Sequence, residues 1–132
     1  MLFRSAIGSR VVEMSPEAHD AAFAAVSHFP HLLAFGYMAG LLQQKDSEQF
    51  LALAGPGFRD FTRIAASDPA IWRDILIANR EEVLKQSERF RGALAVLERV
   101  LQDCHGDALE ALIKGVSTAR GHWRMGQNAR HN

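Results

Sequence analysis

The sequence predicts an all-α fold, a helical bundle, and three observations lead to this prediction. Between residues 83 and 104, apolar side chains recur in alternating steps of three and four, with Ser87 in the one missing place, which is the spacing of one helix face. Ser15-Pro16-Glu17 is a helix start, with a hydroxyl cap, proline at the first helical position and an acid in the first turn. Only one short stretch, residues 10–14, has the composition of a strand.

That short strand precedes the first predicted helix. We find no second segment in the sequence that would pair with it, so its sheet is expected to belong to a preceding domain. Residues 1–14 are therefore predicted to be a remnant or linker from a nucleotide-binding domain, residues 15–125 a helical domain, and residues 126–132 a frayed tail.

The first helix is expected to run from Ser15 to about Gln44. Pro30 lies inside it and should bend it, because proline removes the hydrogen bond to the carbonyl of Val26. The freed carbonyl and the bend make this point a candidate pocket wall.

Residues 21–42 contain no Asp, Glu, Lys or Arg, and such a run is long enough to span a bilayer. We favour a helix covered by protein, because His28, Pro30 and His31 would lie near the membrane centre, where ionisable groups are costly. In a chain of 132 residues, a second subunit is expected to cover part of this helix.

Further helices are expected along the rest of the chain. A short helix capped by Ser47 should run to about residue 54, and a helix capped by Ser67 or Asp68 should break near Asn79. Gly106 is expected to end the next helix, and a last one should span about residues 107–123. The helix between Asn79 and Gly106 carries a seam suited to a bundle or a subunit contact, formed by Val83, Phe90, Leu94, Leu97, Leu101 and Cys104.

The composition excludes some partners. Fifteen basic and 15 acidic residues give a formal net charge of zero, which predicts no attraction to nucleic acid or to an acidic membrane. Cys104 is the single cysteine, so no internal disulfide is possible, which fits a cytoplasmic protein. Its apolar position predicts an inert, buried thiol.

The segment after residue 54 predicts an anion site. Gly55 and Gly57 flank a turn that allows the backbone to approach a ligand, and a helix start follows with free N–H groups. Arg59 and Arg63 add guanidinium groups, whose planar fork matches a carboxylate, and Asp60 lies between them. These features indicate a small carboxylate ligand but no reaction.

Four segments together carry a resemblance to a known family. In order, they are residues 15–20, 26–31, 57–69 and 72–75, which read SPEAHD, VSHFPH, GFRDFTRIAASDP and WRDI. They resemble the C-terminal domain of prephenate dehydrogenase and its arogenate and cyclohexadienyl relatives. The similarity extends from about Val11 to Arg120.

The resemblance implies part of a tyrosine-biosynthesis enzyme that oxidatively decarboxylates prephenate to 4-hydroxyphenylpyruvate with NAD⁺ or NADP⁺. In that family an N-terminal Rossmann domain holds the nicotinamide and the catalytic histidine. The C-terminal domain forms an intertwined homodimer and completes the substrate site, where tyrosine often inhibits. This sequence has no Gly-x-Gly-x-x-Gly turn, so neither a cofactor site nor a catalytic residue is expected in it, and alone it should not turn over. Prephenate and arogenate both stay open as substrates.

Motif by motif, the resemblance assigns roles to particular residues. It implies that Arg63 binds a substrate carboxylate and that His31 donates a hydrogen bond to the substrate or to tyrosine. His19 is a weaker candidate near the same pocket. The alternatives are an ion pair of Arg63 with an aspartate and a hydrogen bond of His31 to a carbonyl freed by Pro30.

The remaining candidates are secondary. Asp60 is expected to pair with Arg59 or Arg63 and to gate entry, and Arg59 itself is a substrate-binding candidate. Trp72 is a candidate pocket wall, with packing as the alternative. Pro56 replaces a glycine common in relatives, which stiffens the turn.

The histidines of the first helix do not suggest a metal centre. His28 is expected to be a hydrogen-bonded interior residue. No metal is expected, because no cysteine or suitably spaced carboxylate completes a ligand set with His19, His28 and His31. A second function class stays open: a stand-alone helical dimer that serves as an interaction or regulatory module without catalysis.

Overall fold

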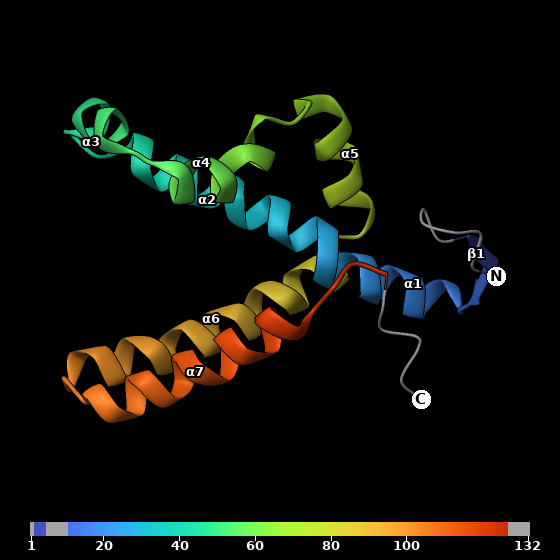
Figure 1. Ribbon diagram of the computed structural model, residues 1–132. Helices are drawn as coiled ribbons and strands as arrows, with labels where there is room; N and C mark the ends of the chain where they lie inside the picture. Colours follow the sequence, from blue (N-terminus) through green and yellow to red (C-terminus); the bar gives the residue numbers. More distant parts are fainter. Residues whose placement is uncertain (1, 5–10, 127–132) are drawn as a thin grey trace. The chain divides into compact units, whose positions relative to one another are not determined.

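The computed structural model describes residues 2–4 and 11–126, and nearly all of these residues are helical (Figure 1). The all-α prediction is confirmed. The predicted tail lies outside the described residues except for Gly126. The helical elements are α1 (Pro16–Phe23), η1 (Ala24–His28), α2 (Phe29–Leu42), α3 (Ser47–Leu53), α4 (Pro56–Thr62), η2 (Arg63–Ala66), α5 (Pro69–Ala78), α6 (Arg80–Gln102) and α7 (Gly106–His122).

The predicted strand is present but is not alone. Strand β2 (Val11–Glu13) pairs in an antiparallel ladder with β1 (Leu2–Arg4), in which Leu2 lies opposite Glu13. The prediction of an orphan strand is therefore wrong, because a three-residue partner is too short to produce a recognisable alternation in the sequence. A preceding domain is no longer needed to supply a partner for β2, and the division at residue 14 stays a prediction.

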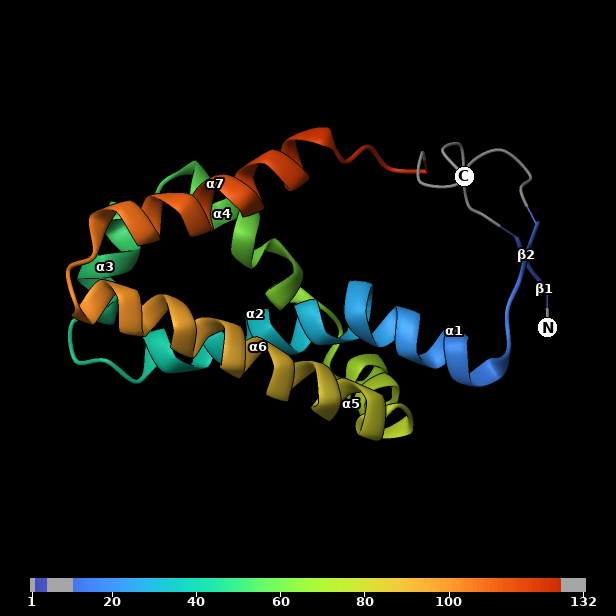
Figure 2. The same cartoon turned by 90° about the horizontal axis from the view of Figure 1, so that it is seen from below.

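The chain divides into two compact units, residues 16–87 and residues 1–15 with 88–132. In the first unit, α1, η1 and α2 follow one another as a continuous rod, and α4 and η2 pack on α2 (Figure 1). Figures 1 and 2 both place α3 at the end of α2 that is remote from α1. In the second unit, the C-terminal part of α6 and α7 run antiparallel on either side of a short linker (Figure 2).

The irregularity at Pro30 takes a specific form. The segment directly before it, η1, is a π-helix, in which the N–H of Phe29 donates to the carbonyl of Ala24 five residues earlier. Pro30 then occupies the first turn of α2, where a missing N–H costs little. The proline thus ends a widened turn, and π-helical turns of this kind occur often at functional sites.

Two helix boundaries differ from the predictions. Helix α4 begins at Pro56, with Gly55 as its N-cap, so Gly57 lies within the helix and not in the turn. Proline is favoured at a first helical position, and this preference outweighs the two glycines. Asp46, and not Ser47, occupies the N-cap position of α3.

The junctions around α5 agree with the predictions. The Asp68 carboxylate caps α5 by accepting a hydrogen bond from the Ile71 N–H at 2.8 Å. Asn79 separates α5 from α6, as predicted.

The linker between α6 and α7 was predicted incorrectly. Cys104 has φ 51°, in the left-handed region, and Gly106 begins α7 instead of ending α6. The ring of His105 caps α7, since its Nδ1 accepts from the Ala108 N–H at 3.1 Å. Cys104 is exposed, so the prediction of a buried thiol is wrong.

Apolar side chains are poorly covered within the chain. Among the described residues, the fully buried apolar ones are Ala24, Ala34 and Val83. Val26 is 73% exposed, and the seam residues Leu94 and Leu101 are 40% and 64% exposed. The helices therefore present apolar faces that the described part of the chain does not bury.

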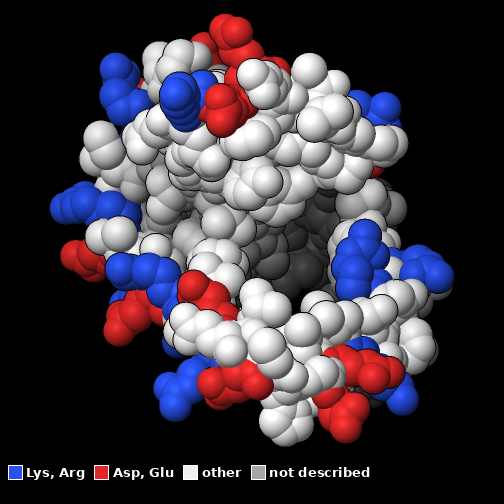
Figure 3. Space-filling model, turned by 90° about the vertical axis from the view of Figure 1, so that its left-hand side faces the viewer, with Lys and Arg blue, Asp and Glu red and all other residues white. Residues whose placement is uncertain are grey.

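The surface carries both signs of charge. On the face shown in Figure 3, lysine and arginine side chains alternate with aspartate and glutamate, and no large area has a single sign. No helix in the described ranges 11–126 combines the length and apolar character needed to cross a bilayer.

Candidate functional site

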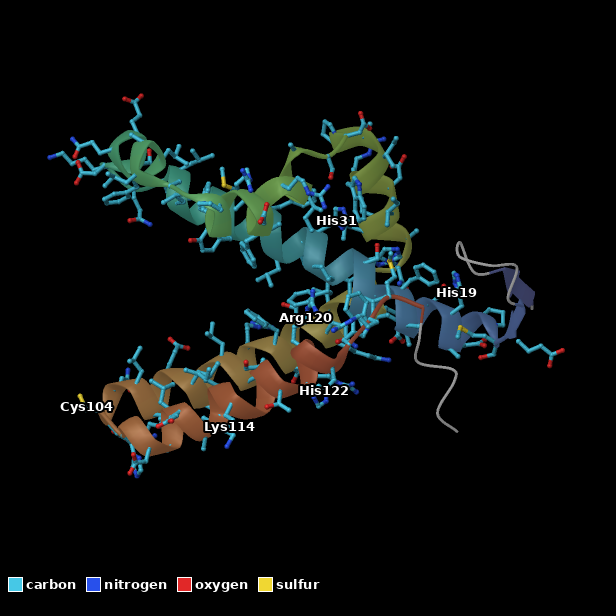
Figure 4. The ribbon with its side chains drawn as sticks, in the orientation of Figure 1. His19, His31, Cys104, Lys114, Arg120 and His122 are labelled. Atoms are coloured by element: carbon cyan, nitrogen blue, oxygen red, sulfur yellow. The ribbon has the colours of Figure 1, made fainter. Side chains whose placement is uncertain are left out.

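His31 lies in the first turn of α2, and two contacts fix its ring (Figure 4). Nδ1 lies 2.8 Å from the backbone oxygen of Ser27, and the ring stacks on Trp72 with centroids 3.5 Å apart and planes 14° apart. A carbonyl oxygen can only accept, so Nδ1 carries the hydrogen. In the neutral ring, Nε2 is then an acceptor, and it donates only when the ring is protonated. This bond goes to Ser27 and not to Val26, whose carbonyl Pro30 was expected to free, and the role of His31 stays a prediction.

Trp72 forms the wall of an open hollow beside this stack. The hollow has a volume of about 390 Å³, within the range of small-molecule sites. The lining is mostly apolar, with Arg73 as its charged member, and the Arg73 guanidinium Nε lies 2.9 Å from Asp74. The residues lining the hollow are Phe35, Ala65, Ser67, Pro69, Trp72, Arg73 and Leu76.

Local structure positions this wall. The Asp68 cap starts α5, and Ser67 Oγ donates to the backbone oxygen of Ile64, which closes the turn between η2 and α5. Phe35 meets Trp72 edge-on, with centroids 6.5 Å apart. Sequence reasoning missed Phe35 and Arg73, although Arg73 follows directly after Trp72 in the WRDI motif.

Arg63 lies at the start of η2, and its side chain is exposed. Within the described residues it makes no ion pair, so the alternative pairing with Asp60 or Asp68 is not seen. Its guanidinium is available to an anion. Asp60 instead pairs with Arg59, with 3.2 Å between Arg59 Nε and Asp60 Oδ1. Arg63 is not among the residues that line the hollow.

The helix start of the predicted anion site is present, but it begins at Pro56, between the two glycines, and not after them. Gly55 and Gly57 are exposed, and a side-chain Cβ added at either would meet no atom within 4 Å. Helix α4 has only seven residues, so its N-terminal N–H groups provide a weak dipole. Arg63 is left as the stronger cationic element of the prediction.

His19 lies on α1, away from His31 on α2 (Figure 4). Its ring is 4.4 Å from that of Phe23, and its Nδ1 is 3.6 Å from Asp20. A series of ring contacts runs from His19 through Phe23 and His28 to Trp72. The structure therefore places His19 at the far end of this series and not beside the hollow.

His28 is part-buried between these rings. Its Nδ1 lies 3.1 Å from the side-chain nitrogen of Asn79, and its ring meets Trp72 edge-on at 6.2 Å. Burial lowers the pKa of His28 below 6.5, and the nearby His31 and His19 act in the same direction, while Asp20 opposes them. His28 is thus a hydrogen-bonded interior histidine, as expected.

Comparison with known proteins decides the family. Residues 15–115 match the family described as "Prephenate dehydrogenase, dimerization domain". The chain belongs to this family. The resemblance predicted from the four segments is thereby confirmed.

Two relatives and one solved structure show how far the similarity extends. The chain is 37% identical to prephenate dehydrogenase of Bacillus subtilis (strain 168), over 84% of this chain and 29% of that protein. It is 34% identical to cyclohexadienyl dehydrogenase of Zymomonas mobilis, over 86% of this chain and 40% of that protein. The structure of prephenate dehydrogenase from A. aeolicus in complex with hydroxyphenyl propionate and NAD⁺ superposes with a TM-score of 0.76 and 41% identity.

The chain spans less than half of each relative. The superposition covers 81% of this chain but 38% of the A. aeolicus chain. The match therefore concerns the dimerization domain of a larger type of enzyme.

Proposed function

We propose that this chain acts as the dimerisation and substrate-binding part of a prephenate dehydrogenase. The observation that carries this proposal is the family match over residues 15–115. The reaction of the whole enzyme would be oxidative decarboxylation of prephenate, or of arogenate, with NAD⁺ or NADP⁺. The chain spans a minor part of its relatives, so we expect it to be inactive alone.

The described residues do not fit a dinucleotide. A Rossmann site needs a parallel strand, a glycine-rich turn and a helix N-terminus, whereas the described strands form a three-residue antiparallel pair. We assign no step of the reaction to a cofactor bound by these residues. The nucleotide-binding domain of the enzyme is the expected partner for that step.

The proposed contribution of this chain is to bind and orient the substrate, prephenate or arogenate. Arg63, exposed and without an ion pair in the described part of the chain, supports the proposed bidentate contact with a substrate carboxylate. Trp72, which stacks on His31 and lines the hollow, offers a flat wall for a six-membered ring. Asp60, paired with Arg59, is proposed to gate entry of the substrate to Arg63. His19 stays a weaker candidate for substrate binding, because it lies apart from the hollow.

The exposed apolar faces support a homodimer. Leu94, Leu97 and Leu101 on α6 and Val116 on α7 are uncovered within the chain, and burial against a second copy would remove them from water. We propose an intertwined arrangement of two copies, in which tyrosine is a possible competitor of the substrate.

Calorimetric titration of prephenate and of tyrosine tests the site. We expect binding to the 132-residue chain and a loss of about 2 kcal/mol, roughly 30-fold in Kd, in Arg63→Ala, because a charged hydrogen-bond partner is removed. Arg99→Ala is the matched control, since Arg99 pairs with Asp103 on an exposed part of α6. Equal binding by wild type and Arg63→Ala would contradict the assignment of Arg63.

A second function stays open beside this proposal. In this alternative the chain is a helical dimer that serves assembly or regulation without catalysis. Light scattering would then show a dimer, while neither prephenate nor tyrosine would bind. Binding of either acid would exclude this alternative.

A further inference from the structure

Asn79 has a structural role that extends beyond its helix boundary. Its backbone N–H donates to the carbonyls of Ile75 and Ile77 and ends α5, and its carbonyl accepts from the Val83 N–H at 3.0 Å and begins α6. Both backbone groups are therefore used by the two helices. The side chain remains available for contacts elsewhere.

That side chain connects the α5–α6 junction to the first helical segment. Its nitrogen Nδ2 lies 2.9 Å from the backbone oxygen of Asp20 on α1 and 3.1 Å from Nδ1 of His28 on η1. A backbone carbonyl can only accept, so the amide nitrogen, and not its oxygen, must face Asp20. The same NH₂ group has a second hydrogen, which it donates to His28. Nδ1 of His28 is then an acceptor, and the proton of the neutral ring is on Nε2.

His28 transmits this contact to the pocket wall. Its ring meets Trp72 edge-on, with the two planes 77° apart. Trp72 lines the hollow and stacks on His31. His31 has the opposite tautomer, because its Nδ1 donates to Ser27. The orientation of Trp72 is thus determined by two imidazoles whose protons are each fixed by a backbone or side-chain partner.

We propose that Asn79 is a positioning residue of the site: its amide fixes the tautomer of His28 and thereby holds the Trp72–His31 stack in place for the ring of the bound acid. This inference rests on the proposed function for the identity of the ligand. The hydrogen-bond arrangement itself does not depend on it.

The electrostatic surroundings agree with a neutral His28. Asp20 and His19 face it from α1 and His31 from α2, and burial lowers its pKa despite the carboxylate. Asn79 also lines a polar hollow. The charged residues that line this hollow are Glu17, Asp20, Arg80, Glu81 and Glu82.

Two substitutions at Asn79 test its hydrogen bond to His28, and a control variant measures the effect of a general loss of stability. Asn79→Ala removes the donor and should allow both tautomers of His28. Asn79→Asp places a carboxylate at Nδ1, which favours the imidazolium and should raise the titration midpoint of His28 by about one pH unit or more. Arg80→Ala is the matched control, because it removes an exposed hydrogen bond to the backbone oxygen of Ile77 at the same α5–α6 junction without touching His28.

The first readout is NMR of the intact chain with ¹⁵N-labelled histidine, which distinguishes the two tautomers. We expect an unprotonated Nδ1 on His28 in the wild type and in Arg80→Ala. We also expect the Trp72 indole resonance, assigned with the help of Trp123→Phe, to shift in both Asn79 variants and not in the control. A protonated Nδ1 in neutral wild-type His28, or an unchanged Trp72 resonance in Asn79→Ala, would overturn the proposal.

The second readout is tyrosine affinity by calorimetry. Weaker binding by Asn79→Ala than by Arg80→Ala supports the positioning role, and equal binding overturns it. If the wild type binds neither tyrosine nor prephenate, the proposed function fails. The NMR outcomes then still decide whether Asn79 orients His28 and Trp72.

Discussion

Two neighbouring histidines, His28 and His31, carry the hydrogen of the neutral ring on different nitrogens. His31 carries its hydrogen on Nδ1 because Ser27 accepts it, whereas His28 is unprotonated at Nδ1 because Asn79 donates to it. Both rings contact Trp72. A proton added to His28 would meet the amide hydrogens of Asn79 and would break this arrangement.

The pH dependence of stability follows from His28. Its folded-state pKa is lowered below 6.5, chiefly by burial, so the unfolded chain binds the proton first as the pH falls. The contribution of neutral His28 to the free energy of unfolding is fully present above about pH 6.5, and it is lost as the pH falls through the folded-state pKa. We expect the urea midpoint to drop between pH 7.5 and pH 5, and to drop less in His28→Asn. An equal drop in both proteins would contradict this account.

At the scale of elements, short-range chemistry determines most helix boundaries. Asp68 starts α5 with its carboxylate, Asn79 ends it, and Pro56 begins α4 at its preferred position. These boundaries depend on neighbouring residues only. The π-helical turn η1 is a different case, because it combines a local cause, Pro30, with distant contacts from Asn79.

Removal of the α5 cap should have a measurable cost. Asp68→Ala leaves the Ile71 N–H without its acceptor, and we expect a loss of about 1 kcal/mol in the free energy of unfolding. Asp68→Asn keeps an acceptor oxygen and should lose much less. Urea denaturation of the three proteins measures this, and equal losses in both variants would show that the cap is not the cause.

At the scale of the whole molecule, the chain lacks cover for its apolar faces. Leu97 and Leu101 on α6 are 37% and 64% exposed, although their spacing is that of a packed seam. An apolar seam with no cover in the described part of the chain implies a partner surface. The family is described as a dimerization domain, which agrees with the proposal that a second copy is this partner.

Introduction of a charge on this seam should weaken the dimer. Leu101→Glu would place a carboxylate in the apolar contact, and we expect a lower mass by light scattering at micromolar concentration. Glu98→Lys on the same helix is the control, because it changes charge outside the seam. A dimer that withstands Leu101→Glu would place the subunit contact elsewhere.

The sequence predicted local features well and long-range ones poorly. The helix starts at Pro16 and after Asp68 were predictable, because capping depends on a few adjacent residues. The pairing of β1 with β2 was missed, since three residues carry too little pattern. Gly106 was misassigned because Cys104, and not a glycine, takes the left-handed conformation.

In the candidate site, too, local motifs were predictable and long-range contacts were not. Arg63, His31 and Trp72 were found through motifs, and their roles remain predictions. Asn79 was expected only to break a helix, because its partner His28 lies 51 residues away and no local signal reports such a contact. The place of His19, apart from His31, likewise depends on the path of α1 and not on its motif.

The linker between α6 and α7 gives the chain a useful property. Its single cysteine, Cys104, is exposed there at φ 51°, between two long helices. A nitroxide attached to this thiol would mark one defined point on each copy without any engineered cysteine. Pulsed electron spin resonance on the labelled protein would then give a single distance distribution between two copies, which reports directly how they are arranged.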